Sequence, residues 1–194
     1  MSNEGTQVKG ISELFTPYEA VPNAAMAIVD GHVAWVGAEA ALPSAYAAWP
    51  SVDLGGNAVI PGLVDSHTHL IWAGDRLDEY LLRARGASYP EILAAGKGIY
   101  ETVAATRSAS EASLLLSARR RAGAFLRSGV TALEIKSGYS LDTEGELRML
   151  RVARQLGEEG PQRVTTTLLA HVPDKDVPRE TYLATFLSET LPEA

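Results

Sequence analysis

The stretch Ala58-Val59-Ile60-Pro61-Gly62-Leu63-Val64-Asp65-Ser66-His67-Thr68-His69 decides how this chain is interpreted. Its apolar residues predict a buried strand from Val59 to Thr68. Successive side chains of a strand point to opposite faces, so His67 and His69 share one face with Asp65. Two imidazoles on one face can bind a single zinc or iron ion. We therefore predict that His67 and His69 are metal ligands; the alternative is that two ordinary histidines end a strand.

The composition is that of an ordinary globular protein. The chain has 194 residues, of which 46% are hydrophobic and 21% are charged. Lys and Arg total 17 against 24 Asp and Glu, which gives a formal net charge of -7. This acidic balance argues against nucleic acid as a partner, because phosphate binding needs clustered cations. The absence of cysteine excludes disulfides and thiolate metal sites.

The chain shows no sequence signal for export or membrane insertion. Residues 1–5 are polar and acidic, with no apolar signal core behind them. No stretch reaches the roughly 20 apolar residues that a membrane-spanning helix requires. The simplest expectation is therefore a soluble, cytoplasmic protein without membrane partners.

Two segments differ in their sequence rhythm. Residues 1–58 predict a small β-rich unit that includes a hairpin, because Asp30-Gly31 separates two short apolar runs. His32 belongs to this hairpin and is expected at the surface. Residues 59–194 instead alternate strand and helix patterns.

This alternation predicts a parallel sheet. Further strands are expected over residues 130–136 and 164–170, and helices over residues 77–85 and 89–106. Gly96 and Gly98 interrupt the second helical pattern, and a loop there is the alternative. More helices are expected after two apparent capping boxes, Ser108-x-x-Glu111 and Thr143-x-x-Glu146, and after Pro178. Ligands of such sheets bind at the carboxyl ends of the strands.

Polar residues follow each predicted strand. His67 and His69 lie at the end of the first and Arg76 after it, Tyr139 comes after the second and His171 after the third. Each residue alone is a weak signal, since each has an ordinary structural explanation. Because parallel strands end at the same rim, we expect these side chains to converge on one site.

Two other charged groups have structural explanations. The run Arg119-Arg120-Arg121 lies within a helical pattern, so a solvated helix face is expected. Glu134 and Lys136 share one face of a strand, which predicts an ion pair on the sheet. A carbamylated Lys136 that bridges metal ions is a less favoured alternative.

Longer motifs resemble a known family. Residues 61–69 match the first-strand signature of the amidohydrolase superfamily, and the rest resemble the imidazolonepropionase family. The motifs are Ala73-Gly74-Asp75-Arg76, Gly86-Ala87-Ser88-Tyr89, Ala95-Gly96-Lys97-Gly98-Ile99, Thr102-Val103-x-x-Thr106-Arg107 and Glu134-Ile135-Lys136-Ser137-Gly138-Tyr139. The resemblance runs from about Ala58 to His171.

The resemblance implies a fold and an activity. The fold is a (β/α)8 TIM barrel, of which about the first three strand–helix units are present, with a small β-sandwich. The activity is hydrolytic opening of the small molecule 4-imidazolone-5-propanoate to N-formimidoyl-L-glutamate, in histidine breakdown. His67 and His69 would bind one zinc or iron ion, divalent or trivalent. Arg76, Tyr89, Tyr139 and His171 would contact the substrate.

The chain also departs from the family pattern. In the family, a third metal-binding histidine, an acidic residue and an aspartate ligand come from later strands, and none of the four histidines here is left for that role. Around His171 the family has one more residue, which affects the alignment of His171. We therefore expect little or no turnover by this chain alone, and no catalytic acid or base is assigned.

Three interpretations remain open. The first is an imidazolonepropionase, shown in part or truncated. The second is another cyclic amidohydrolase or deaminase of the superfamily, which the motifs around Arg76 and Tyr139 disfavour. The third is a non-catalytic fragment that acts through association with another polypeptide. The sequence leaves open whether the chain forms a homodimer.

Overall fold

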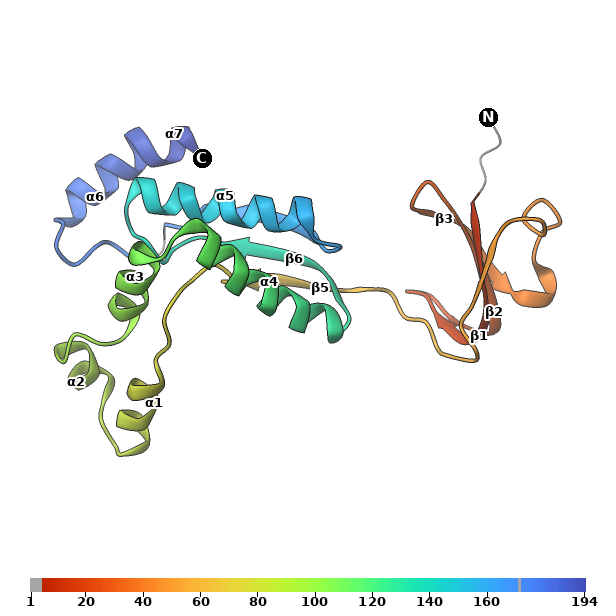
Figure 1. The fold of residues 1–194 in the computed structure, drawn as a ribbon, viewed down its shortest axis with the longest axis horizontal. Coiled ribbons are helices and arrows are strands. Elements are labelled where there is room, and N and C mark those ends of the chain that lie inside the picture. Colours follow the sequence, from red (N-terminus) through yellow and green to blue (C-terminus); the bar gives the residue numbers. More distant parts are fainter. Residues whose placement is uncertain (1–4, 171) are drawn as a thin grey trace. The chain divides into compact units, whose positions relative to one another are not determined.

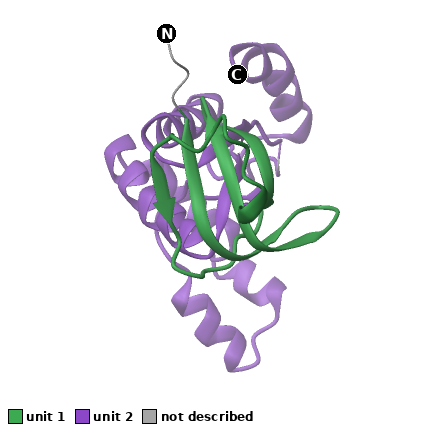
Figure 2. Ribbon diagram, turned by 90° about the vertical axis from the view of Figure 1, so that its right-hand side faces the viewer, with its two compact units in different colours: residues 1–61 green, residues 62–194 purple. Residues whose placement is uncertain are grey.

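The structure is a computed structural model that describes residues 5–170 and 172–194. The chain divides into two compact units, Met1–Pro61 and Gly62–Ala194, each with its own sheet (Figures 1 and 2). The protein is thus a mixed α/β protein that begins with a small β-rich segment.

The first unit contains a four-stranded sheet in the order β3-β2-β1-β4. The strands are β1 (Thr6–Phe15), β2 (Ala20–Val29), β3 (His32–Ala38) and β4 (Ser51–Asp53), with a short 3-10 helix η1 (Glu39–Ala41) after β3. β1 pairs antiparallel with β2 and parallel with β4, and β2 pairs antiparallel with β3. Ile11, Leu14 and Ala24 form its small buried core.

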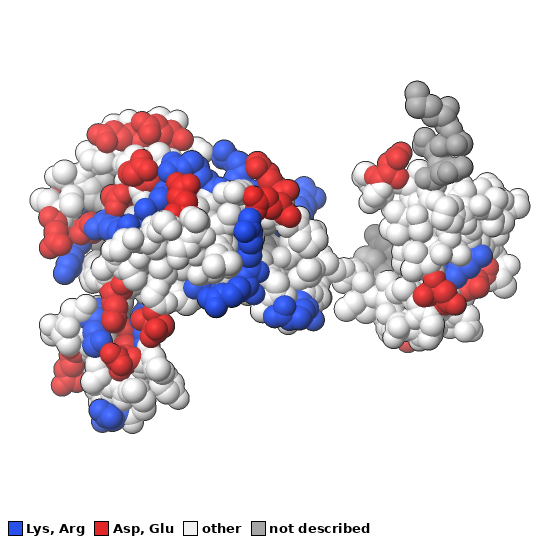
Figure 3. All heavy atoms as spheres, viewed as in Figure 1, with Lys and Arg blue, Asp and Glu red and all other residues white. Residues whose placement is uncertain are grey.

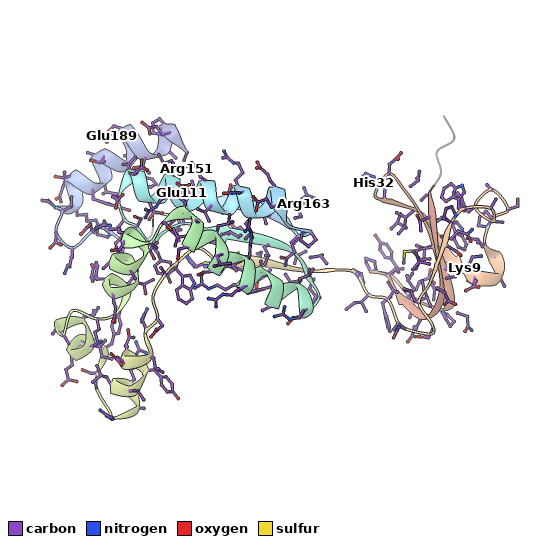
Figure 4. All side chains as sticks on the ribbon, in the orientation of Figure 1. Lys9, His32, Glu111, Arg151, Arg163 and Glu189 are labelled. Atoms are coloured by element: carbon purple, nitrogen blue, oxygen red, sulfur yellow. The ribbon has the colours of Figure 1, made fainter. Side chains whose placement is uncertain are left out.

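The predicted hairpin is confirmed between β2 and β3. Asp30 and Gly31 have φ of 50° and 73°, the left-handed values that a tight two-residue turn requires. His32 begins β3, is exposed, and lies 2.8 Å through Nδ1 from the Asp30 carbonyl oxygen (Figure 4). Its surface position agrees with the prediction.

The second unit is built on a parallel sheet in the order β5-β6-β7. Its strands are β5 (Leu63–Thr68), β6 (Val130–Lys136) and β7 (Arg163–Thr167). Its helices are α1 (Leu77–Ala84), α2 (Tyr89–Ala94), α3 (Ile99–Ser108), α4 (Glu111–Arg127), α5 (Thr143–Glu159), α6 (Arg179–Thr185), the π-helical turn η2 (Phe186–Thr190) and α7 (Leu191–Glu193).

Helices α4 and α5 lie alongside this sheet (Figure 1). Leu133 and Ile135 of β6 are buried in one core with apolar residues of α4 and α5, among them Leu114 and Val152. Glu134 and Lys136 alternate with them and are only half-buried. Because side chains of a strand alternate, these two charged residues lie on the opposite face of the sheet.

The helical pattern over residues 89–106 is divided into two helices at Gly96 and Gly98, the interruption for which the sequence left a loop open. Gly96 and Gly98 adopt φ of 75° and 83° in the segment between α2 and α3, which a continuous α-helix does not allow. This break places α3 beside the segment that follows β5, where the Thr106 hydroxyl accepts a 3.1 Å hydrogen bond from the Ala73 N–H.

Charges of both signs are interspersed on the face of the second unit that Figure 3 shows. Arg151 of α5, for example, lies 2.8 Å from Glu111 of α4 (Figure 4). Within the described ranges, none of the helices combines the length and the apolar character needed to cross a membrane.

Candidate metal and substrate site

The two histidines of the sequence motif lie together at the carboxyl end of β5. His67 is the penultimate residue of the strand and is exposed, and His69 follows the strand and is half-buried. Their ring centres are 5.7 Å apart, with 56° between the ring planes. The Asp65 carboxylate accepts a 3.2 Å hydrogen bond from the His67 backbone N–H, where the pairing of β5 with β6 shifts register between Asp65 and Thr68.

This arrangement fits a shared metal ion. With bonds of about 2.1 Å to one nitrogen of each ring, two ring centres around one ion can be up to about 6.4 Å apart. The observed spacing lies within that limit. Imidazole nitrogen is also a donor that both zinc and iron accept. Among the described residues, however, no group of three or more His, Asp, Glu or Cys side chains is arranged to hold a metal ion.

A charged cluster lies on the same face of the sheet. The Lys136 ammonium and the Thr167 hydroxyl donate to Glu134 Oε1 at 2.5 and 2.6 Å. These bonds, and to a lesser degree the charge of His67, lower the pKa of Glu134. The predicted Glu134–Lys136 ion pair is therefore confirmed, and it gives the sheet a negative carboxylate beside His67.

A pocket opens next to these histidines. It has a volume of about 250 Å³ and is lined by His69, Trp72, Asp75, Arg76, Thr102 and Tyr139. Three residues predicted separately from the sequence, His69, Arg76 and Tyr139, thus meet in one cavity. Tyr139 packs against the His69 ring with the ring centres 5.1 Å apart.

The guanidinium of Arg76 is held by Glu79. Arg76 Nε and Nη2 donate to the two oxygens of Glu79 at 2.7 and 2.6 Å. The Arg76 side chain is 36% exposed, whereas that of Glu79 is only 3% exposed. Hydrogen bonds from Arg76 lower the pKa of Glu79 although its burial opposes this, and the same bonds raise the pKa of Arg76. Arg76 therefore places a charged guanidinium at the pocket wall, and the carboxylate of Glu79 balances that charge from behind.

The other two residues predicted to contact the substrate are Tyr89 and His171. Tyr89 begins α2, is 48% exposed and does not line the pocket with Arg76. Its ring instead lies 5.4 Å from the Arg83 guanidinium. His171 lies outside the described residues.

Sequence reasoning missed residues that shape this pocket. Trp72 is one wall, and Arg121 of α4 lies 3.5 Å from the centre of its ring. Arg121 Nη1 also donates to the carbonyl oxygens of Leu70 and Trp72 at 2.8 and 2.9 Å. The expectation that Arg121 belongs to a solvated face was wrong, because this side chain holds the segment that follows His69. A lone Trp after the histidine motif was the only available signal.

The chain is similar in sequence to curated imidazolonepropionases. It is 54% identical over 153 residues to that of Paraburkholderia phymatum, which covers 79% of this chain and 38% of the relative. It is 46% identical over 179 residues to that of Aromatoleum aromaticum, which covers 91% of this chain and 43% of the relative. The chain therefore spans about two fifths of the length of these relatives. No family model matches it.

A solved structure shares the fold. Crystalline atrazine chlorohydrolase from Arthrobacter aurescens, complexed with zinc, matches 94% of this chain and 43% of its own, with a TM-score of 0.52 and 17% identity. At this identity the match concerns the fold alone. The sequence matches show that this chain is similar to imidazolonepropionases over 79–91% of its length, and the structural match shows a fold shared with atrazine chlorohydrolase.

Proposed function

We propose that this chain forms part of an imidazolonepropionase, which opens the ring of 4-imidazolone-5-propanoate by hydrolysis to N-formimidoyl-L-glutamate. The observation that carries the proposal is the pocket in which His69, Arg76 and Tyr139 meet beside His67. The identity of 46–54% to curated imidazolonepropionases supports it.

The proposed fold of residues 59–194 is the first three strand–helix units of a (β/α)8 barrel, with residues 1–58 as part of a small β-sandwich. The parallel order β5-β6-β7 and the packing of α4 and α5 against β6 support this proposal. In such barrels the site lies at the carboxyl ends of the strands, which is where His67, His69 and Tyr139 lie.

His67 and His69 would hold one zinc or iron ion in this proposal. When bound, the ion supplies Lewis-acid chemistry that makes water nucleophilic near neutral pH. The two imidazoles leave coordination positions for other ligands and for water. The spacing of the two rings and the zinc in a protein of the same fold support this assignment.

The chain's own residues would orient the substrate. Arg76 would bind the propionate carboxylate through N–H groups that Glu79 does not occupy, because a guanidinium has five such donors. Tyr139 would donate its hydroxyl hydrogen to the ring oxygen on which negative charge develops. His171 and Tyr89 are further proposed contacts of the substrate.

Metal binding by the full chain tests the proposal. We expect zinc, measured by titration calorimetry of the metal-free protein, to bind to the wild type and to lose at least about tenfold in affinity in His67→Ala and His69→Ala. His32→Ala is the matched control, since His32 is an exposed histidine of the other unit. Equal zinc affinity in all four proteins would refute the metal assignment.

Turnover is the second measurement. The isolated chain with added zinc or iron is expected to open 4-imidazolone-5-propanoate slowly or not at all, because its described residues offer two imidazoles where a catalytic zinc has three protein ligands. A rate near that of an intact imidazolonepropionase would contradict this expectation. A measurable rate that His69→Ala abolishes would support the assignment of the site.

A further inference from the structure

A buried carboxylate lies behind the loop that carries Tyr139. Glu146 of α5 is only 4% exposed. Its Oε2 accepts the Gly138 N–H at 2.6 Å, and its Oε1 accepts the N–H groups of Ser140 and Leu141, each at 2.8 Å. A carboxylate that accepts several backbone donors forms charge-assisted bonds, which are stronger than neutral ones. One side chain thus fixes both ends of a four-residue loop.

The loop has a backbone conformation that needs such support. Gly138 has φ of 111° and Leu141 has φ of 64°. A bulky residue such as leucine adopts a positive φ only where the surroundings enforce it. Gly145 allows the loop to lie on the first turn of α5, since a Cβ there would overlap the Ser140 hydroxyl. The carboxylate of Glu146 and the missing side chain of Gly145, both on α5, therefore determine the path of the loop.

Tyr139 lies between Gly138 and Ser140, two of the three residues whose backbone N–H groups Glu146 binds. Its backbone is flanked by Gly138 and Ser140, whose N–H groups both point to the same carboxylate. Its ring packs on His69 and lines the pocket with Arg76. We infer that Glu146 is a positioning residue that holds Tyr139 against His69. The role of Tyr139 in catalysis rests on the proposed function, whereas its position rests on these contacts.

Glu146 itself does not act on the substrate. It does not line the pocket, and both of its oxygens accept backbone hydrogen bonds. Its contribution is to keep the Tyr139 ring in place before a ligand arrives, which is the way a supporting residue increases the precision of a site.

Nuclear magnetic resonance of the full chain tests the inference. The variant is Glu146→Gln, which keeps the shape but replaces one acceptor by a donor. The matched control is Glu158→Gln, which alters an exposed glutamate of the same helix. We expect Glu146→Gln to lose the nuclear Overhauser effect between the Tyr139 and His69 rings. The amides of Gly138, Ser140 and Leu141 should exchange hydrogen about tenfold faster, while the amides of β6 remain protected. The control should resemble the wild type.

Retention of the Tyr139–His69 effect with unchanged amide exchange in Glu146→Gln would overturn the inference. If that variant does not fold, scalar coupling across the hydrogen bond between the Gly138 nitrogen and the Glu146 carboxyl carbon is measured in the wild type, and its absence would overturn the inference too.

Zinc titration separates the two proposals. Zinc affinity is expected to be the same in Glu146→Gln as in the wild type, because Glu146 holds the tyrosine and not the metal ligands. Loss of the ring contact in a chain that binds no zinc would leave the inference standing and refute the metal site.

Discussion

At the residue scale, three charged side chains that do not line the pocket themselves hold the residues that do. Glu79 holds the Arg76 guanidinium, Arg121 holds the segment from Leu70 to Trp72, and Glu146 holds the Tyr139 loop. Burial, more than the nearby charge of Arg120, lowers the pKa of Arg121. Buried charges are costly unless they are paired, so each of these groups marks a segment whose position matters.

The Arg76–Glu79 pair predicts how stability depends on pH. The pKa of Glu79 is lowered in the folded chain, so its contribution is complete above the ordinary glutamate pKa of about 4.3 and fades as the pH falls through the lower folded value. Glu79→Gln should lower the free energy of unfolding by about 2 kcal/mol at pH 7. The free energy of unfolding of the variant should also fall less than that of the wild type as the pH is lowered. Urea unfolding at pH 7 and in a series of increasingly acidic buffers measures both effects.

The control for this prediction is Glu189→Gln, since Glu189 is exposed on η2 (Figure 4). Its unfolding free energy should follow that of the wild type across the pH range. If Glu79→Gln unfolds at the same urea concentration as the wild type at every pH, the Arg76–Glu79 pair contributes nothing to stability.

At the element scale, the helix starts differ from the sequence patterns. Ser108 closes α3, and the N-cap of α4 is Ser110, whose hydroxyl accepts the Ser113 N–H at 3.2 Å. The N-cap of α5 is Asp142, which accepts the Gly145 N–H at 2.7 Å. Both predicted capping boxes were therefore wrong in register. Glu146 does not cap α5 because its carboxylate binds the loop before the helix instead.

The observed caps predict unequal effects of two nearby serines. Ser110→Ala should lower the free energy of unfolding by about 1 kcal/mol, because it leaves a backbone donor of α4 without its partner. Ser108→Ala should change it by less than about 0.5 kcal/mol, since the Ser108 hydroxyl only donates to the Ala104 carbonyl oxygen within its own helix. Chemical unfolding of both variants measures the difference. A larger effect at Ser108 would support the original capping box.

At the scale of the whole molecule, the sheet of the second unit has two edge strands, β5 and β7. On β5, Leu63 and Val64 are 48% and 71% exposed. Exposed apolar residues on an edge strand favour pairing with another chain. The isolated chain is therefore expected to self-associate through this strand.

Val64→Lys tests this expectation, because a lysine on an edge strand opposes edge-to-edge pairing. Sedimentation velocity should show concentration-dependent association of the wild type and less of it in the variant. Leu116→Lys is the control, since Leu116 is 61% exposed but lies on α4. Equal association of all three proteins would exclude β5 as the surface involved.

Local patterns in the sequence determined several elements. The strand at residues 130–136 was predicted with its observed bounds and the Asp30-Gly31 turn at its observed position, because alternation and turn chemistry act between neighbouring residues. The same alternation placed Glu134 and Lys136 on one face. β1 was missed because its register shifts between Val8 and Ile11, where Gly10 has φ of 64°, so its pattern does not alternate regularly.

The sequence by itself predicted that His67, His69, Arg76 and Tyr139 would converge, since all lie at or after the carboxyl ends of strands of a parallel sheet, and His69, Arg76 and Tyr139 line one pocket. Only the tertiary structure decided how that site is supported. Whether a charged residue on a helix faces solvent or binds a distant backbone depends on the segment packed against it, which no local pattern specifies. Arg121 is one such residue, since its backbone partners Leu70 and Trp72 lie 51 and 49 residues away in the sequence. Glu146 is another, since it binds the backbone of the loop that carries Tyr139.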